Sequence, residues 1–327
     1  MARFPKIPVC KIKSKLGKGP TAKVYSGIQG ELRREVAIKV LNSPLLKNSA
    51  VAATFIEKAQ NMTTLRHPNI IRTFYNGFAY KYHYIVMERL EISLKDRIKR
   101  FRKKKKIYPE MALDIVAELL GALDHVHSKG IYHKNIKPSN IMFRKDNPNM
   151  PVLTDLDLVP LISLKNLTKS KQDMDIAYYL SPEQCRSKKY GDGRSDIYSL
   201  GVVLFEMLTG KKPYEGKTPE SVLAQHKGKP VPRLPQDLIL YQPLIDRMMA
   251  KDVEKRLSGS AEFLQLLDKV LLSIFGSPVK KEFTFKKIKK TTGLMKGFVF
   301  LARICMVVII DTSVFAGKIL RILFRKK

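Results

Sequence analysis

The chain has 327 residues, 44% of them hydrophobic and 28% charged, fractions that are typical of a folded protein and exclude an intrinsically disordered one. Its 61 Lys and Arg against 29 Asp and Glu give a formal net charge of +32, which favours anionic partners such as a membrane surface or nucleic acid. A solvated basic surface without a partner is the alternative explanation. Cys10, Cys185 and Cys305 show no C-x-x-C spacing, which argues against a disulfide framework or a zinc site and indicates a reducing compartment.

The N-terminal part of the chain predicts a β-rich region. Residues 1–9 are basic and hold no apolar run long enough for a signal peptide. Lys11–Val24 is typical of a strand, a turn that contains Gly17 and Gly19, and a second strand. Glycines at such a turn let backbone N–H groups approach phosphate oxygens without a Cβ in the way. Val36–Lys39 (VAIK) then predicts a strand that ends on a lysine.

Helical patterns follow in chain order. Ala50–Arg66 has helical periodicity, which predicts a helix. Ser93–Lys99 predicts a short helix. The basic run Lys99–Lys106 is interpreted as a solvated loop, with polyanion docking as the sharper alternative. Pro109–Ser128 predicts a long amphipathic helix with proline in its first turn.

Two short polar stretches come next: His133–Asn140 reads HKNIKPSN, and Thr154–Asp157 reads TDLD. With the VAIK strand before them, they resemble the H-R-D-L-x-x-x-N catalytic loop and the D-F-G metal-binding turn of eukaryotic-type protein kinases, in the bacterial Ser/Thr form. Further matches follow in the family's order. Ser181–Glu183 resembles the A-P-E box, Asp196–Gly201 the central helix of the larger lobe, and Asp252–Arg256 a late segment whose arginine pairs with the glutamate of that box.

The resemblance implies an α+β fold: the two-lobed protein kinase fold, with a β-rich N-lobe, a helical C-lobe and a C-terminal apolar or amphipathic helix. The expected organisation is an N-terminal tail at 1–9, a kinase-like domain at 10–275 with its N-lobe at 10–88 and its C-lobe at 89–275, a basic linker at 276–293, and a membrane-associating or docked helix at 294–327.

The resemblance also implies a site for ATP and Mg²⁺. Lys39 is expected to pair with the α- and β-phosphates and Lys137 to reach the γ-phosphate, while Asn140 and Asp155 are expected to hold Mg²⁺. The residues expected to bind the nucleotide are Gly17, Gly19, Val24, Ala37, Lys39, Glu88 and Leu90.

Several departures from the family pattern surround the reaction centre. Asn135 stands where the family has the aspartate that accepts the substrate hydroxyl proton, and an amide has no basic lone pair near neutral pH. Ile176 replaces a threonine that hydrogen-bonds this aspartate, and Asp157 replaces the glycine of the metal turn. In the helix that should offer a glutamate to the VAIK lysine, the family spacing places Lys58, with Glu57 one position earlier as the alternative.

The C-terminal tail is strongly apolar over Gly293–Lys327. If this segment is helical, its charged residues lie within a narrow stripe, a pattern that favours an in-plane helix at an anionic membrane surface. A membrane span over Gly297–Gly317 and a helix docked on the lobes are the alternatives. The tail therefore predicts a cytoplasmic protein held at the cytoplasmic face of a membrane.

The expected function is that of a pseudokinase: a kinase-like chain that binds ATP and Mg²⁺, has impaired phosphotransfer because of Asn135, and serves as a membrane-tethered signalling or interaction module. A slow but active Ser/Thr kinase is the first alternative, because positioning and electrostatics supply most of the catalysis of phosphoryl transfer. A polyanion-binding scaffold is the second alternative. Among anionic partners, nucleic acid ranks below an anionic membrane surface. The sequence identifies neither the protein substrate nor the signalling partner.

Overall fold

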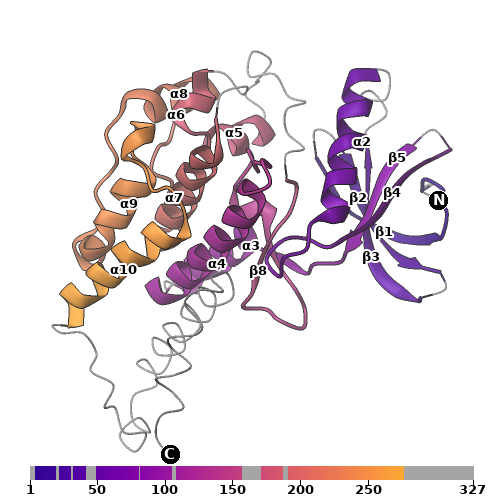
Figure 1. Cartoon of the computed structure of the whole chain (residues 1–327), viewed down its shortest axis with the longest axis horizontal. Helices are drawn as coiled ribbons and strands as arrows, with labels where there is room; N and C mark the ends of the chain where they lie inside the picture. The colour runs from indigo at the N-terminus through magenta and orange to yellow at the C-terminus, as the bar shows by residue number, and fades with distance from the viewer. Residues whose placement is uncertain are drawn as a thin grey trace, which may run out of the picture.

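The N-terminal lobe is built on an antiparallel sheet with the strand order β1-β2-β3-β5-β4 (Figure 1). The computed structural model describes residues 4–19, 22–30, 32–41, 49–80, 82–104, 108–156, 171–186 and 191–275. The strands of this sheet are β1 (Cys10–Lys18), β2 (Ala22–Gln29), β3 (Arg34–Leu41), β4 (Thr73–Ala79) and β5 (Tyr82–Glu88). The side chains of β3 are buried without a break from Val36 to Leu41, because both faces of this central strand are covered.

Helix α2 (Ser49–Thr64) packs against one face of this sheet. Phe55, Ala59 and Met62 recur at helical spacing on α2 and form a cluster with residues of β3 and β5. On the opposite face, Val36, Ile38 and Val40 join Tyr25 and Ile7 in a second cluster, as the period of two along a strand requires. The helix predicted over 50–66 is thus confirmed to within two residues.

The second lobe is helical, and its core surrounds α7 (Gly193–Thr209), which is buried from Ser195 to Leu208. The side chain of Asp192 caps the first turn of α7, and Gly210, with φ of 69°, ends the helix in the left-handed conformation that glycine adopts freely. The remaining elements are α3 (Leu94–Lys104), α4 (Pro109–His127), α5 (Lys171–Ala177), α6 (Pro182–Arg186), α8 (Pro219–Gly228), α9 (Gln242–Met248), α10 (Ser260–Phe275), the 3-10 helices η1 (Pro138–Asn140), η3 (Gln236–Tyr241) and η4 (Val253–Lys255), and a small sheet of β6 (Ile92–Ser93), β7 (Ile141–Phe143) and β8 (Pro151–Leu153).

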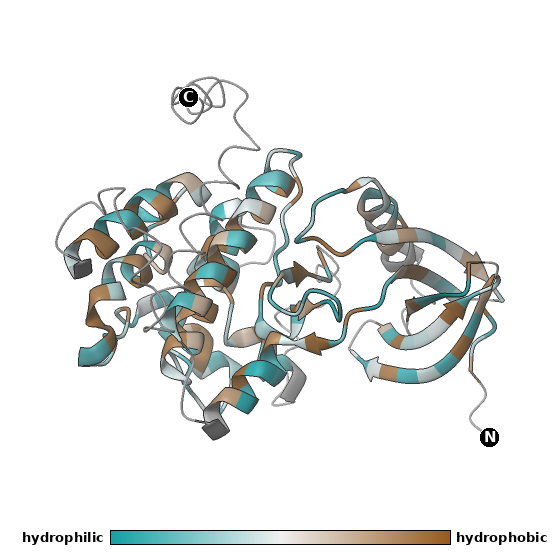
Figure 2. Cartoon of the chain, turned by 90° about the horizontal axis from the view of Figure 1, so that it is seen from below, coloured by the Kyte–Doolittle hydropathy of each residue, from teal (hydrophilic) through white to brown (hydrophobic). Residues whose placement is uncertain are grey.

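The expected α+β fold with a β-rich lobe and a helical lobe is confirmed (Figures 1 and 2). Figure 2 shows hydrophobic and hydrophilic residues alternating along the helices and strands, as is typical of amphipathic elements that cover a core. The predicted helix over 109–128 forms as α4, with Pro109 in its first turn. The expected linker at 276–293 and the expected C-terminal helix at 294–327 lie outside the described residues.

One sequence-based expectation was wrong in its boundary. The interpretation of Lys99–Lys106 as a solvated loop fails over its first part, because α3 continues to Lys104. Leu94, Ile98 and Phe101 share one face of this longer helix, and burial of Leu94 and Ile98 fixes that face on the helical lobe while the basic residues continue the helix. Within the described residues, none of the helices combines the length and the apolar character needed to cross a membrane.

The two lobes are joined at the end of β5 by an ion pair that the sequence patterns did not predict. Arg144, just after β7, donates from Nε and Nη2 to the two carboxylate oxygens of Glu88 at 2.7 and 2.8 Å, and from Nη1 to the carbonyl of Pro68 at 2.7 Å. A two-pronged pair of this kind fixes orientation as well as distance. The pair therefore fixes the connection between the lobes through the carboxylate of Glu88. It does not use the backbone groups of Glu88.

Candidate nucleotide site

An ion pair between a buried lysine and a half-buried aspartate connects the two lobes at the candidate site. Lys39, near the end of β3, is 5% exposed, and its Nζ lies 2.7 Å from Oδ1 of Asp155, which follows β8. Burial alone would raise the pKa of Asp155, but the charge and hydrogen bond of Lys39 outweigh it and lower the pKa. Asp155 has φ of 63°, a conformation that is strained for a residue with a side chain and is typical of functional positions.

The backbone of the predicted catalytic loop is held by one carboxylate of α7. Asp196 is 1% exposed and accepts hydrogen bonds from the backbone N–H groups of His133 at 2.8 Å and Lys134 at 2.7 Å, and it lies 2.9 Å from Nε2 of His127. The loop also places Lys134 at φ of 59°. Asp196, which begins the segment that resembles the central helix of the larger lobe, thus supports the strained backbone of the loop.

His133 is a packing residue of the loop. Its ring is fully buried, and burial lowers its pKa, so the imidazole is neutral near pH 7. Within the described residues, neither ring nitrogen has a hydrogen-bond partner. His133 is consequently sealed away from any substrate and does not replace the missing base.

Asn140 is tied to both halves of the predicted metal site. Its Nδ2 donates to the carbonyl of Asn135 at 2.9 Å, and its own carbonyl accepts from the backbone N–H of Thr154 at 2.9 Å and from the Thr154 hydroxyl at 3.2 Å. Asp155 follows Thr154 directly, so the amide of Asn140 and the carboxylate of Asp155 are held at neighbouring points. One carboxylate and one amide oxygen fit Mg²⁺, which completes its shell with phosphate and water oxygens.

The two residues of the catalytic loop that face the reaction are partly accessible. Lys137 is the N-cap of η1, and both Lys137 and Asn135 are half-buried. Burial lowers the pKa of Lys137, and the negative charges of Asp175 and then Asp155 oppose that shift. Within the part of the chain that the structure describes, Lys137 thus lies in the field of Asp155, which belongs to the predicted site, and of Asp175, which does not.

The residues predicted around the adenine form an apolar cluster. Ala37, Met87 and Leu90 belong to a single buried cluster together with Val152, and Val24 packs against it. These side chains come from β2, β3, the end of β5 and β8, so both lobes contribute. Such a cluster at the junction of the lobes suits the flat apolar faces of a purine ring.

The predicted phosphate-covering turn joins β1 to β2. Gly17 lies opposite Val24 in the sheet, and the backbone N–H of Gly19 donates to the carbonyl of Ala22 at 2.8 Å. A Cβ added at Gly17 would meet no atom within 4 Å, so packing within the protein does not require glycine there. Open space above the strand is what close approach of a phosphate requires.

The structure describes only some of the predicted departures. Ile176 is 5% exposed and contributes an apolar side chain where the family has a hydroxyl. Glu57 is exposed on α2, so the alternative in which Glu57 is the partner of Lys39 is not found, and Lys39 pairs with Asp155. The side chain of Lys58 and all of Asp157 lie outside what the structure describes.

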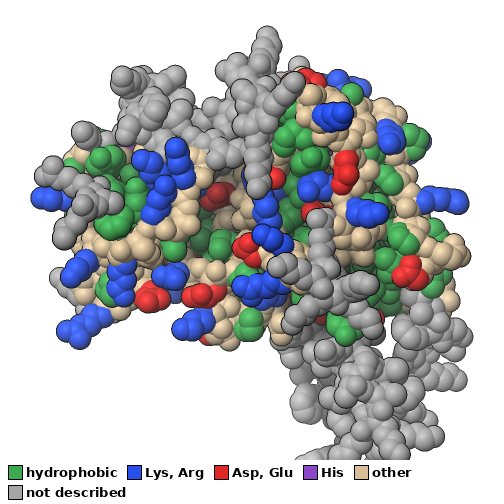
Figure 3. Space-filling view, turned by 180° about the vertical axis from the view of Figure 1, so that it is seen from behind, with side chains coloured by type: hydrophobic (Ala, Val, Ile, Leu, Met, Phe, Trp, Pro, Cys, Tyr) green, Lys and Arg blue, Asp and Glu red, His purple; other side chains and the backbone are tan. Residues whose placement is uncertain are grey.

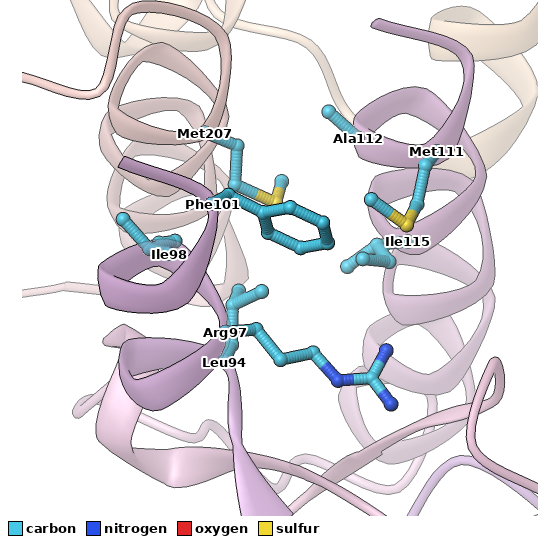
Figure 4. Close-up of a pocket in the computed structure, with 8 residues that line it drawn as sticks. All are labelled: Leu94, Arg97, Ile98, Phe101, Met111, Ala112, Ile115 and Met207. Atoms are coloured by element: carbon cyan, nitrogen blue, oxygen red, sulfur yellow. The ribbon is translucent and has the colours of Figure 1, made fainter. Parts of the chain in front are cut away.

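A small apolar hollow of about 10 Å³ lies elsewhere in the helical lobe, between α3, α4 and α7 (Figure 4). Figure 4 shows the ring of Phe101 directed toward Met111 and Ile115, while the guanidinium of Arg97 points away from them. Arg97 instead lies over the ring of Phe143, 3.4 Å from its centroid. This hollow lacks the polar groups that bind phosphates, so the nucleotide site is assigned to the junction of the lobes.

The predicted pair between the A-P-E-like box and the late arginine is confirmed. Arg256 has no exposed side-chain surface and donates to Glu183 at 2.7 and 3.1 Å. Burial would raise the pKa of Glu183, but hydrogen bonds and charge from Arg256, with a further bond from Ser195, lower the pKa to about 2. This pair anchors the A-P-E-like box, Ser181–Glu183, to the late segment that contains Arg256.

Comparison with known proteins agrees with this geometry. Residues 10–271 match the protein kinase domain family. Serine/threonine-protein kinase PrkC of Bacillus subtilis is 35% identical over 212 residues, which are 64% of this chain and 32% of that protein. PknB of Mycobacterium tuberculosis is 33% identical over 256 residues, 76% of this chain and 40% of that protein.

The chain therefore spans about a third to two fifths of the length of these relatives. Among solved structures, the kinase domain of Mycobacterium tuberculosis PknI superposes with a TM-score of 0.64 at 20% identity, covering 83% of this chain and all of that domain, which supports the fold alone. The chain belongs to the protein kinase domain family, in its bacterial-type serine/threonine branch.

Proposed function

We propose that this protein binds ATP with Mg²⁺ between its lobes and has impaired phosphotransfer to protein hydroxyls, so that it serves in signalling as a pseudokinase. The observation that carries this proposal is the contrast between the two sides of the site. The nucleotide side has the Lys39–Asp155 pair, whose lysine is buried, and the fixed Asn140. The acceptor side has the amide of Asn135 in place of a base.

The residues divide the chemistry between them. Lys39 is placed to neutralise the α- and β-phosphates, and Asp155 and Asn140 to hold Mg²⁺, which when bound neutralises charge on the phosphates. Lys137 is placed to reach the γ-phosphate. Asn135 can orient the acceptor hydroxyl by hydrogen bonding, but it does not take the proton.

A slow but active Ser/Thr kinase is the second candidate function. The assembled set of Lys39, Lys137, Asn140 and Asp155 favours it, because most of the catalysis of phosphoryl transfer comes from positioning and electrostatics. The curated relatives are serine/threonine-protein kinases by name. The two candidates share the nucleotide site and differ in the rate of transfer.

The nucleotide site is tested by a thermal shift of the full chain with ATP, with and without Mg²⁺. ATP at 100 times its dissociation constant stabilises the folded state by about 2.7 kcal/mol, a rise in Tm of about 5 °C for a chain of this size. The rise is expected to require Mg²⁺ and to vanish in Lys39→Ala. A Tm that ATP leaves unchanged in the wild type, with and without Mg²⁺, would contradict nucleotide binding.

We further propose that the protein is held at the cytoplasmic face of an anionic membrane by residues 293–327. The net charge of +32 supports this, and Figure 3 shows Lys and Arg side chains on both lobes. Deleting residues 293–327 is expected to end co-sedimentation with vesicles that contain anionic lipid. A deletion variant that still sediments would contradict the anchor, and tight nucleic-acid binding that falls steeply with salt would favour the polyanion-binding scaffold instead.

A further inference from the structure

A carboxylate outside the family's motifs lies beside the reaction centre. Asp175, in α5, forms an ion pair with Lys95 in the first turn of α3, through its Oδ2. Lys95 and Asp175 are 80 residues apart, so this contact arises only in the folded chain. Figure 1 shows α5 on the side of the helical lobe nearest the sheet lobe.

The ion pair places Asp175 next to the catalytic loop. Helix α3 packs against η1, and Lys137 is the residue that begins η1. Among the described residues, Asp175 and Asp155 bring negative charge to bear on Lys137, and Lys95 brings positive charge. Lys137 is the residue expected at the γ-phosphate, so the charge of Asp175 acts at the reaction centre.

The surrounding structure fixes this position. Ile176, the next residue, is 5% exposed and anchors α5 in the lobe. Tyr179 follows, and its carbonyl accepts a hydrogen bond from the Ser199 hydroxyl of α7 at 2.6 Å. The side chain of Asp175 keeps 29% of its surface exposed, so its carboxylate is held in place and still open to a substrate.

We propose that Asp175 accepts the proton of the substrate hydroxyl in this protein, in place of the carboxylate that is missing at Asn135. This inference rests on the proposed function, because it requires Mg²⁺ and ATP in the site. The residual phosphotransfer of an impaired kinase then depends on a residue from α5 and not from the catalytic loop.

The step balances with ATP and a Ser or Thr hydroxyl as the two reactants. The hydroxyl oxygen forms a bond to the γ-phosphorus while the bond from that phosphorus to the bridging oxygen of ADP breaks, and the electron pair leaves with ADP. The hydroxyl proton passes to the carboxylate of Asp175. Lys95 occupies Oδ2, and a carboxylate has a second oxygen that can accept a proton.

The test is a phosphotransfer assay with labelled ATP and a generic Ser/Thr peptide mixture on full-length Asp175→Asn. Its rate is expected to fall about tenfold or more, the usual contribution of a general base at its lower end. Asp173→Asn, on the same helix, is the matched control and is expected to change the rate less than about threefold. The Mg²⁺-dependent thermal shift by ATP is expected to stay the same in both variants, which separates this test from that of nucleotide binding.

The same substitution made in a second variant, Asn135→Asp, distinguishes a proton acceptor from a structural residue. In the Asn135→Asp variant the loop again has a base, so adding Asp175→Asn is expected to cost less than about threefold, because residues with one shared role are not additive. An equal loss in both backgrounds would overturn the proposal, since it would indicate a structural role for the ion pair. No loss in the wild-type background, or no detectable transfer by the wild type despite Mg²⁺-dependent ATP binding, would also overturn it.

Discussion

Replacing Asn135 with aspartate is expected to raise the rate of phosphotransfer about tenfold or more. The backbone of the loop is already held by Asp196, which accepts from the N–H groups of His133 and Lys134. The carbonyl of Asn135 is also held by the side chain of Asn140, at 2.9 Å. The substitution therefore places a base on a scaffold that is already assembled, at nearly unchanged side-chain volume.

The measurement is the initial rate of label transfer from ATP at saturating Mg²⁺, for the wild type and for Asn135→Asp. The two proteins are first shown to have the same Tm, so that a difference in rate does not reflect a difference in stability. Lys39→Ala in the Asn135→Asp background is the control, and it is expected to remove the gain because the gain requires bound nucleotide. A rate that stays at the wild-type value would show that the amide at Asn135 is not the limiting defect. In that case Ile176, which lacks the hydroxyl of the family's threonine, becomes the next residue to change.

Removing Arg256 is expected to destabilise the helical lobe by about 3–5 kcal/mol, the usual result of breaking a buried ion pair from one side. Its guanidinium bonds the Glu183 carboxylate and also the carbonyls of Arg194 and Ala250, at 2.9 and 3.1 Å. In Arg256→Ala these acceptors lose the hydrogen bonds from the guanidinium, while Glu183 keeps the bond that the Ser195 hydroxyl donates at 2.6 Å. Denaturant unfolding measures the change in free energy.

A matched control separates burial from charge. Arg247 also forms an ion pair, with Glu262, but its side chain is 45% exposed. Arg247→Ala is expected to cost less than about 1 kcal/mol, because exposed ion pairs contribute little. Equal destabilisation by the two substitutions would contradict the view that the Glu183–Arg256 pair is a special anchor of the fold.

The same pair predicts a pH dependence of stability. The pKa of Glu183 falls from 4.5 to about 2 on folding, so the pair stabilises the folded state fully above about pH 4.5 and loses this contribution as the pH falls toward 2. The difference in unfolding free energy between the wild type and Arg256→Ala is therefore expected to shrink over this range.

The fold and most of the site could be predicted because their signals are local. The strand with Lys39, the loop with Asn140 and the turn with Asp155 each carry several defining residues within a few positions. Such motifs specify backbone geometry, and the geometry then brings Lys39 and Asp155 to 2.7 Å. Asp196 and Arg256 were predictable for the same reason.

The contacts that sequence reasoning missed join residues that no motif relates. Arg144 and Glu88 are 56 positions apart, and Lys95 and Asp175 are 80 apart, so only the packed lobes bring them together. The extension of α3 was missed because a run of basic residues resembles a solvated loop, while Phe101 supplies the apolar contact that favours a helix. A signal for Asp175 was present: it is a carboxylate directly beside Ile176, one of the departures around the reaction centre.

The central claim is that the nucleotide side of the site works while proton transfer limits the reaction. It is tested most directly by a single-turnover experiment on the full wild-type chain, in which labelled ATP, Mg²⁺ and a peptide acceptor are mixed with excess protein and both bound ATP and phosphopeptide are followed in time. The expected result is rapid, Mg²⁺-dependent binding followed by transfer at least about a hundred times slower than binding. Transfer that keeps pace with binding, or ATP that never binds, would contradict the claim.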